Sequence, residues 1–272
     1  MTSLNRILAA TLGSAAMLAS TNASASSIDL TGGYNICKTT DGATVCSAKG
    51  EGAESTGSGT FPEFVGTVGG QDPTFFMYNT TTKPLEELNV VGNGANQNRD
   101  VTLGDFAVTS LGGVDVFTFV LDINQFTPDP LLSLDHVSIF MGDGSLTGYN
   151  ATTDKLGGVS ATWAMPIDDS VILNYLLAGG SGHGDMFLYI PTSFFSAFGT
   201  TAHLQLYSAF GAGYPNNDGF EEWSYLSCTD TEGARCYTPP PPTPVPEPGT
   251  FALLGLGLAG LRSYRRRVAA RS

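Results

Sequence analysis

Basic side chains are scarce in this sequence, and the scarcity limits what the protein can bind. The 272 residues include 12 Lys and Arg against 25 Asp and Glu. Six of the basic residues and one of the acidic residues lie within the first 25 and the last 28 positions, which leaves six basic and 24 acidic residues, a net charge near −18, for the rest. Such a surface repels the phosphates of nucleic acids and anionic membranes. We therefore expect no nucleic-acid partner.

The motifs of common catalytic sites are also missing. The sequence has no His-Glu-x-x-His and no Walker A motif, and residues 180–182 (Gly-Ser-Gly) lack the spacing of a Gly-x-Ser-x-Gly nucleophile elbow. His136, His183 and His203 have no partner at a recognisable spacing, so ordinary strand and loop positions explain them better than catalysis. We predict a protein that is not an enzyme, with no catalytic residue and no required cofactor.

The N-terminus has the three parts of a secretory signal peptide. Arg6 supplies the positive charge, residues 7–19 form an apolar stretch, and residues 23–25 (Ala-Ser-Ala) match the small-x-small cleavage pattern. The pattern predicts a signal peptide over residues 1–25 and a mature N-terminus near Ser26.

The C-terminus forms a second three-part pattern. A Pro-rich linker covers residues 238–244, an apolar run follows at 251–261, and arginines close the chain. The residues of interest are the motif Val245, Pro246, Glu247 and Pro248, and the basic tail Arg262, Arg265, Arg266 and Arg267. This order, over residues 245–272, resembles the PEP-CTERM sorting domain of Gram-negative bacteria.

The resemblance implies that an exosortase-type membrane protease recognises this segment and cuts near residues 246–248. The chain would then be exported, held transiently in the inner membrane, and delivered to the cell surface or extracellular matrix. Residues 249–261 would span about 20 Å as a transmembrane helix, against a hydrocarbon core about 30 Å thick, so we expect a temporary anchor. The arginines should stay on the cytoplasmic side.

The four cysteines lie in two local pairs, Cys37 with Cys46 and Cys228 with Cys236. An even number of cysteines in an exported chain is typical of disulfides. Three pairings are possible. We favour the two local ones, while the others would tie the ends of the domain together. Neither pair has the Cys-x-x-Cys spacing of a zinc site.

Residues 26–237 are expected to form one all-β domain, a β-sandwich or jelly-roll-like extracellular fold. Charged residues are only 14% of the chain, against about 25% in typical globular proteins, and Gly-rich turns separate short strand-like segments. Alternation places Leu134 and Phe140 on one face of a strand and Val137 and Ile139 on the other. Strands are predicted at 114–123, 134–141, 185–190, 201–210 and 220–226, and a short helix at 192–198.

Three sequence blocks, residues 121–125, 185–191 and 217–223, resemble a recurring ectodomain of PEP-CTERM proteins. The resemblance implies an all-β extracellular domain with no assigned biochemical role. We expect a structural or adhesive protein of biofilm or exopolysaccharide. The alternative is a carbohydrate-binding module stabilised by calcium. A secreted glycoside hydrolase is a third reading, and it would need two carboxylates across a cleft.

Two sets of residues would carry the alternative functions. Asp122, Asp218 and Glu221 are candidate calcium ligands, since turns offer the clustered oxygens that calcium prefers, although a tight turn with solvated glutamates explains them more simply. Trp163 and Trp223 could stack on sugar rings, but burial in the core is the commoner role of such residues.

Overall fold

The computed structural model describes residues 27–48, 63–66, 73–79, 98–179, 183–219, 221–229 and 235–240. This part of the chain is all-β, with strands joined by loops and short 3₁₀ helices such as η4 (Thr192–Phe195). None of its helices is long and apolar enough to cross a membrane. The predicted signal peptide and C-terminal transmembrane stretch both lie outside the described residues.

The first sheet is built around β9 (Leu131–Gly142), the longest strand. β9 pairs on one side with β16 (His203–Phe210) and on the other with β14 (Ser170–Asn174) and β13 (Trp163–Ala164). The outer strands are β1 (Ser27–Asp29), which runs parallel to β14, and β5 (Phe75–Tyr78) and β6 (Val101–Thr102), which both pair with β16.

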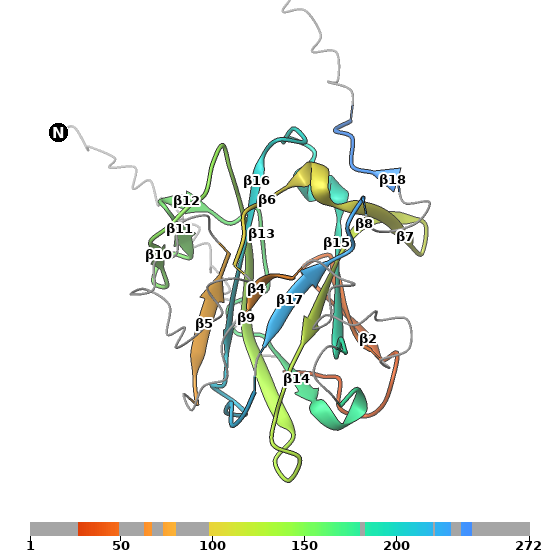
Figure 1. Ribbon diagram of the computed structural model, residues 1–272, viewed down its shortest axis with the longest axis vertical. Helices are drawn as coiled ribbons and strands as arrows, with labels where there is room; N and C mark the ends of the chain where they lie inside the picture. Colours follow the sequence, from red (N-terminus) through yellow and green to blue (C-terminus); the bar gives the residue numbers. More distant parts are fainter. Residues whose placement is uncertain are drawn as a thin grey trace, which may run out of the picture. The chain divides into compact units, whose positions relative to one another are not determined.

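The second sheet is built around β8 (Val114–Asp122) and β15 (Met186–Pro191), which pair over six residues. β3 (Ala43–Ser47) and β2 (Cys37–Thr40) extend it beyond β15. The other side of β8 is shared by β7 (Ala107–Leu111) and β17 (Glu222–Tyr225), which in turn pair with β18 (Arg235–Cys236) and β4 (Glu63–Gly66). Figure 1 shows β5 and β16 on one side of the molecule and β2 and β15 on the other.

The two sheets enclose one hydrophobic core. Alternate residues of each strand point into it because successive side chains of a strand face opposite ways. Phe117 and Phe119 of β8 meet Leu204 and Leu206 of β16 in the same buried cluster. Burial of apolar surface from both sheets is therefore the main stabilising contribution.

A second, smaller core lies on the outer face of the first sheet. Phe140 of β9 and Tyr207 of β16 pack there with Leu156 of β11 (Lys155–Leu156). β11 pairs with β10 (Tyr149–Asn150) and β12 (Val159–Ser160) in a small three-stranded sheet. The small sheet thus has an apolar contact of its own against the main fold.

The five predicted strands are confirmed as β8, β9, β15, β16 and β17, but one predicted face is wrong. Leu134 was expected on the face of Phe140, yet it belongs to the main core with Val137 and Ile139. The cause is a β-bulge, because β16 pairs Ala209 with His136 but Phe210 with Leu134, which skips one residue and reverses the alternation. The predicted helix at 192–198 is the shorter 3₁₀ helix η4.

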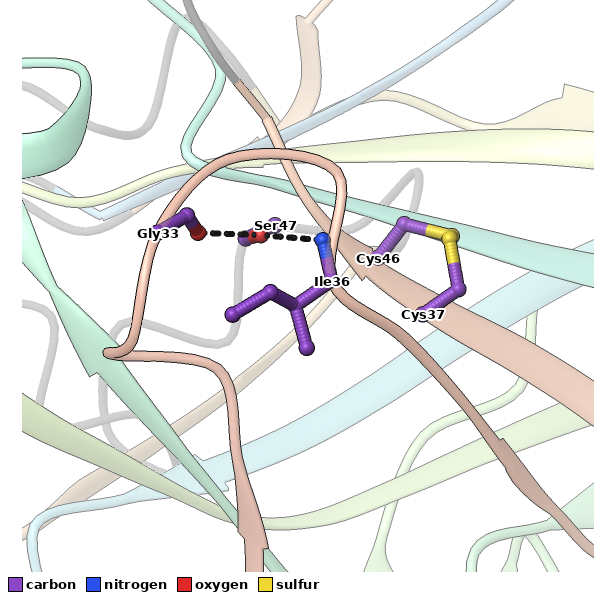
Figure 2. The surroundings of a disulfide bond; sticks show 5 residues. All are labelled: Gly33, Ile36, Cys37, Cys46 and Ser47. Atoms are coloured by element: carbon purple, nitrogen blue, oxygen red, sulfur yellow. Dashed lines mark hydrogen bonds between the residues drawn. A yellow bond between two sulfur atoms is a disulfide. The ribbon is translucent and has the colours of Figure 1, made fainter.

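Both local disulfides are confirmed, Cys37–Cys46 and Cys228–Cys236. Cys37 and Cys46 are register partners on β2 and β3. Figure 2 shows Ser47 beside this bridge, where its hydroxyl donates to the carbonyl of Gly33 at 2.8 Å and accepts from the N–H of Ile36 at 3.0 Å. The disulfide and Ser47 together fix the loop that leads into β2.

Replacing both Cys37 and Cys46 by serine should lower the free energy of unfolding by about 2–3 kcal/mol, the entropy expected for a closed loop of about ten residues. Urea denaturation measures the loss. Under reducing conditions the wild-type curve should shift towards that of the variant. A variant as stable as the oxidised wild type would contradict the prediction.

Candidate functional site

Tyr237 is the last buried residue in the part of the chain that the structure describes. Its side chain is 4% exposed, and its hydroxyl donates to the carbonyl of Phe195 at 2.9 Å. Residues 238–240 are exposed. The chain divides into two compact units, Met1–Thr238 and Pro239–Ser272. The sorting motif at 245–248 and the arginine tail lie in the second unit, outside the described residues.

Three buried carboxyl groups form a row across β17, β8 and β15. Glu222 pairs with Asp122 in register, and Asp185 directly precedes Met186, which pairs with Leu121. All three alternate with core residues and so lie on the sheet face turned away from the core. Asp122 is 0% exposed, and Asp185 and Glu222 are each 5% exposed.

Asp185 has an unusual environment for a carboxyl group. Its Oδ2 accepts the N–H of Ile123 at 2.8 Å, whereas its Oδ1 accepts no hydrogen bond within the described chain. Burial raises the pKa of Asp185 well above its usual range, and the nearby Asp122 and Glu221 add to the rise, while the Ile123 N–H acts in the opposite direction. Burial and the neighbouring carboxyl groups thus make the ionised form of Asp185 less favourable than that of an exposed aspartate.

Amide side chains lie next to the row of three carboxyl groups and form hydrogen bonds there. Glu221 is 0% exposed, and its Oε1 accepts from Nε2 of Gln125 at 3.0 Å. The same nitrogen lies 2.8 Å from Oδ1 of Asn216. Asn217 adds two bonds to this loop, from the N–H of Phe126 to its Oδ1 and from its Nδ2 to the carbonyl of Asp129. The three sequence blocks that were singled out above therefore meet at one end of the second sheet.

The structure does not gather the three calcium candidates as one ligand set. Asp122 and Glu221 are buried, whereas Asp218 is exposed and accepts from the N–H of Gly219 at 2.8 Å, as expected of a tight turn. Among the described residues, no group of three or more His, Cys, Asp or Glu side chains is arranged to hold a metal ion. Asp185 is a carboxylate of this sheet end that sequence reasoning missed.

A serine, a histidine and an aspartate meet on the outer face of the first sheet. Oγ of Ser138 lies 2.8 Å from Nε2 of His136 and 3.0 Å from both carboxylate oxygens of Asp154. Asp154 is also 3.4 Å from the same Nε2, and Nδ1 of His136 has no hydrogen-bond partner in the described chain. A catalytic triad needs the hydroxyl and the carboxylate on different ring nitrogens. This arrangement cannot relay a proton in that way.

The same hydrogen bonds connect the small sheet of β10, β11 and β12 to the first sheet. The hydroxyl of Tyr149 donates to Asp154 at 2.9 Å, and the Tyr149 ring stacks on Tyr207 at 3.6 Å. Burial acts to raise the pKa of Asp154, but hydrogen bonds from His136, Tyr149 and Ser138 outweigh it and hold the pKa below its usual value. The cluster is best explained as a structural contact.

The other two histidines differ from each other. Nδ1 of His203 contacts Oδ2 of Asp100, and Nε2 of Gln205 donates to the other oxygen of Asp100 at 3.3 Å. His183 is exposed. The pairs His136–Asp154 and His203–Asp100 join residues 18 and 103 positions apart, so no local motif could have predicted them.

Both tryptophans are core residues, as the simpler interpretation predicted. Trp163 is 2% exposed and donates its indole N–H to the carbonyl of Asp41 at 3.0 Å. Trp223 is 0% exposed and donates to Oγ of Ser208 at 3.0 Å. Neither offers a ring face on which a sugar could stack.

Comparison with known proteins identifies the C-terminal segment. Residues 244–267 match the family model of the PEP-CTERM protein-sorting motif. The match contains the motif at 245–248 and the arginines at 262–267, so it confirms the resemblance. Searches of curated proteins and of solved structures found no match to this chain. The matched motif implies an exported protein that a membrane exosortase handles, and the C-terminal segment of this chain therefore carries a PEP-CTERM protein-sorting motif.

Proposed function

We propose that this chain is a non-enzymatic protein whose β-sandwich domain is delivered to the cell surface or extracellular matrix after an exosortase removes the C-terminal segment. The observation that carries the proposal is the sorting-motif match at residues 244–267. The motif is the substrate of the sorting step. Glu247 and its flanking prolines are the residues that the exosortase would recognise.

The covalent structure of the folded unit supports an exported location. The four cysteines form two disulfides, and no cysteine is free in the described chain. Disulfides of this kind persist in oxidising compartments outside the cytoplasm. The acidic composition agrees with this location, because a high net charge keeps a protein soluble outside the cell.

A structural or adhesive role in biofilm or exopolysaccharide is our proposal for the domain itself. The buried position of Trp163 and Trp223 removes the aromatic platforms on which the carbohydrate-binding alternative depended. The polar groups at the end of the second sheet are buried, which favours a role in stabilising the fold.

Replacing Glu247 by alanine should block the removal of the C-terminal segment. In a host that has an exosortase, mass spectrometry of surface material should recover wild-type peptides that end before residue 251 and begin near Ser26. The Glu247→Ala protein should keep peptides from residues 251–272 and stay with the membrane fraction.

A matched control tests whether the effect belongs to the motif. Asp168 is an exposed acidic residue of the folded unit, and Asp168→Ala should be processed like the wild type. Recovery of the intact arginine tail from most of the mature wild-type protein would refute the proposed sorting.

A further inference from the structure

Asp122 and Asp185 meet where the two central strands of the second sheet part. β8 ends at Asp122, and Asp185 stands one residue before β15. The N–H of Asp185 donates to the carbonyl of Leu121 at 2.8 Å, and the N–H of Ile123 returns a bond to Oδ2 of Asp185 at 2.8 Å. Neighbouring side chains on one face of a strand pair lie about 5 Å apart at the Cβ atoms. The two carboxyl groups are therefore in direct reach of each other.

The surroundings of this pair are acidic on the sides that the structure describes. From β8 comes Asp122, and from the segment leading into β17 comes Glu221, both of which act on Asp185 through their charge. Glu222 is the next residue along the same row. Just after β3, the N–H of Ala48 donates to the carbonyl of Asp185 at 2.8 Å.

A second negative charge at Asp185 would be costly here. The side chain is 5% exposed, so water cannot stabilise the ion, and the neighbouring carboxyl groups would repel it. One oxygen, Oδ1, accepts no hydrogen bond within the described chain. An oxygen without a donor in a buried carboxyl pair is in the right place to carry a proton itself.

We infer that Asp185 keeps its proton in the folded domain and donates it from Oδ1 to the carboxylate of Asp122. The pair then forms a pH-sensitive hydrogen bond that joins the end of β8 to the start of β15. When the pH rises far enough to remove this proton, the two carboxylates repel each other and the hydrogen bond is lost. This inference concerns the folded unit and does not depend on the sorting of the C-terminal segment.

The direction of the pH effect follows from proton linkage. The pKa of Asp185 is raised in the folded protein, while in the unfolded chain it is about 3.9. The stabilising contribution is therefore complete below the unfolded pKa and is lost as the pH rises through the folded pKa. Between the two values the unfolded chain gives up one proton that the folded protein retains.

Asp185→Asn is the decisive variant, because its amide can still donate to Asp122 but cannot ionise. Urea denaturation of the full chain should be measured from about pH 4 upwards. Relative to the variant, the wild-type folding constant should fall about tenfold for each pH unit between the two pKa values, the effect of one proton. The exposed Asp168→Asn should follow the wild type.

Infrared spectroscopy gives a second, direct readout. The wild-type protein should show the carbonyl band of a protonated carboxyl group at a pH where ordinary aspartates are ionised, and Asp185→Asn should lack it. Because the band is measured on the wild type, its absence would overturn the inference even if the variant does not fold. Parallel stability curves for wild type and variant, or a wild type without the band, would overturn it.

Calcium provides the competing explanation, and the same experiment separates it. A buried carboxyl pair can also be neutralised by a cation. Denaturation should therefore be repeated with calcium and with chelator at matched ionic strength, where we expect identical wild-type curves. A calcium-specific gain that Asp185→Asn abolishes would show that a cation, and not a proton, joins the pair.

Discussion

Trp223→Ala should lower the free energy of unfolding by about 4 kcal/mol, the range seen when a large buried aromatic side chain is truncated. Trp223 lies on β17 of the second sheet, is 0% exposed and belongs to the main core. Its indole N–H donates to Ser208 on β16 of the first sheet. The substitution would therefore leave a cavity between the sheets and a buried hydroxyl that has lost its donor.

Urea denaturation of Trp223→Ala and Trp223→Phe would separate these two effects. The phenylalanine keeps most of the volume but not the N–H, so we expect a loss of about 1–3 kcal/mol from the unsatisfied Ser208 and the smaller ring. A Trp223→Ala protein with wild-type stability would contradict the core position. Altered binding to a polysaccharide with unchanged stability would instead restore the carbohydrate-binding alternative.

Gly211→Ala should be destabilising by about 3 kcal/mol or more, because strain and a steric clash act together. Gly211 follows β16 and has a φ of +93°, a conformation that L-residues rarely adopt. A Cβ built there would lie 1.9 Å from the carbonyl oxygen of Pro73. That oxygen cannot move freely, since it accepts the N–H of Asn216 at 3.0 Å.

Gly112→Ala is the matched control for this effect. Gly112 lies in the turn between β7 and β8 with a φ of +58°, and a Cβ there meets no described atom within 4 Å. Gly112→Ala should lower the free energy of unfolding by about 1–2 kcal/mol, the strain of a residue other than glycine in the left-handed conformation. The difference between the two variants, measured by urea denaturation, isolates the clash with Pro73. Equal losses would show that the close approach at Gly211 is absent.

The strands could be predicted because their signal is local. Alternating residues identified β9 and β16, the β-branched and aromatic residues of 114–123 identified β8, and the two local cysteine pairs were assigned correctly. The sheet face on which Leu134 lies could not be predicted. The β-bulge that reverses its side-chain direction depends on how β9 pairs with β16, some 70 residues later in the chain. Pairing between distant strands leaves no trace in a local pattern.

Only part of the candidate site could be predicted, because its residues come from strands that are distant in the sequence. Asp122 and Glu221 stood out as carboxylates near turns, and the structure brings both to one sheet end. Asp185 was overlooked because its importance comes from its neighbours on β8 and β17. Asp154 was overlooked because it lies in a turn, where it has a φ of +45°, and contacts His136 and Ser138 of β9.

The order in which the strands pair affects how the chain can fold during its synthesis. β1 pairs with β14, β3 with β15, β8 with β17, and β7 with β18, so partners are separated by roughly 100 residues or more. Contacts this distant in sequence make folding slow, because long loops must close before the contacts form. The first sheet cannot be completed until β16 (His203–Phe210) has been synthesised, and the second sheet until β18 (Arg235–Cys236) has been synthesised. We therefore expect the described domain to acquire its full set of sheet contacts only late in synthesis, after most of its chain has emerged.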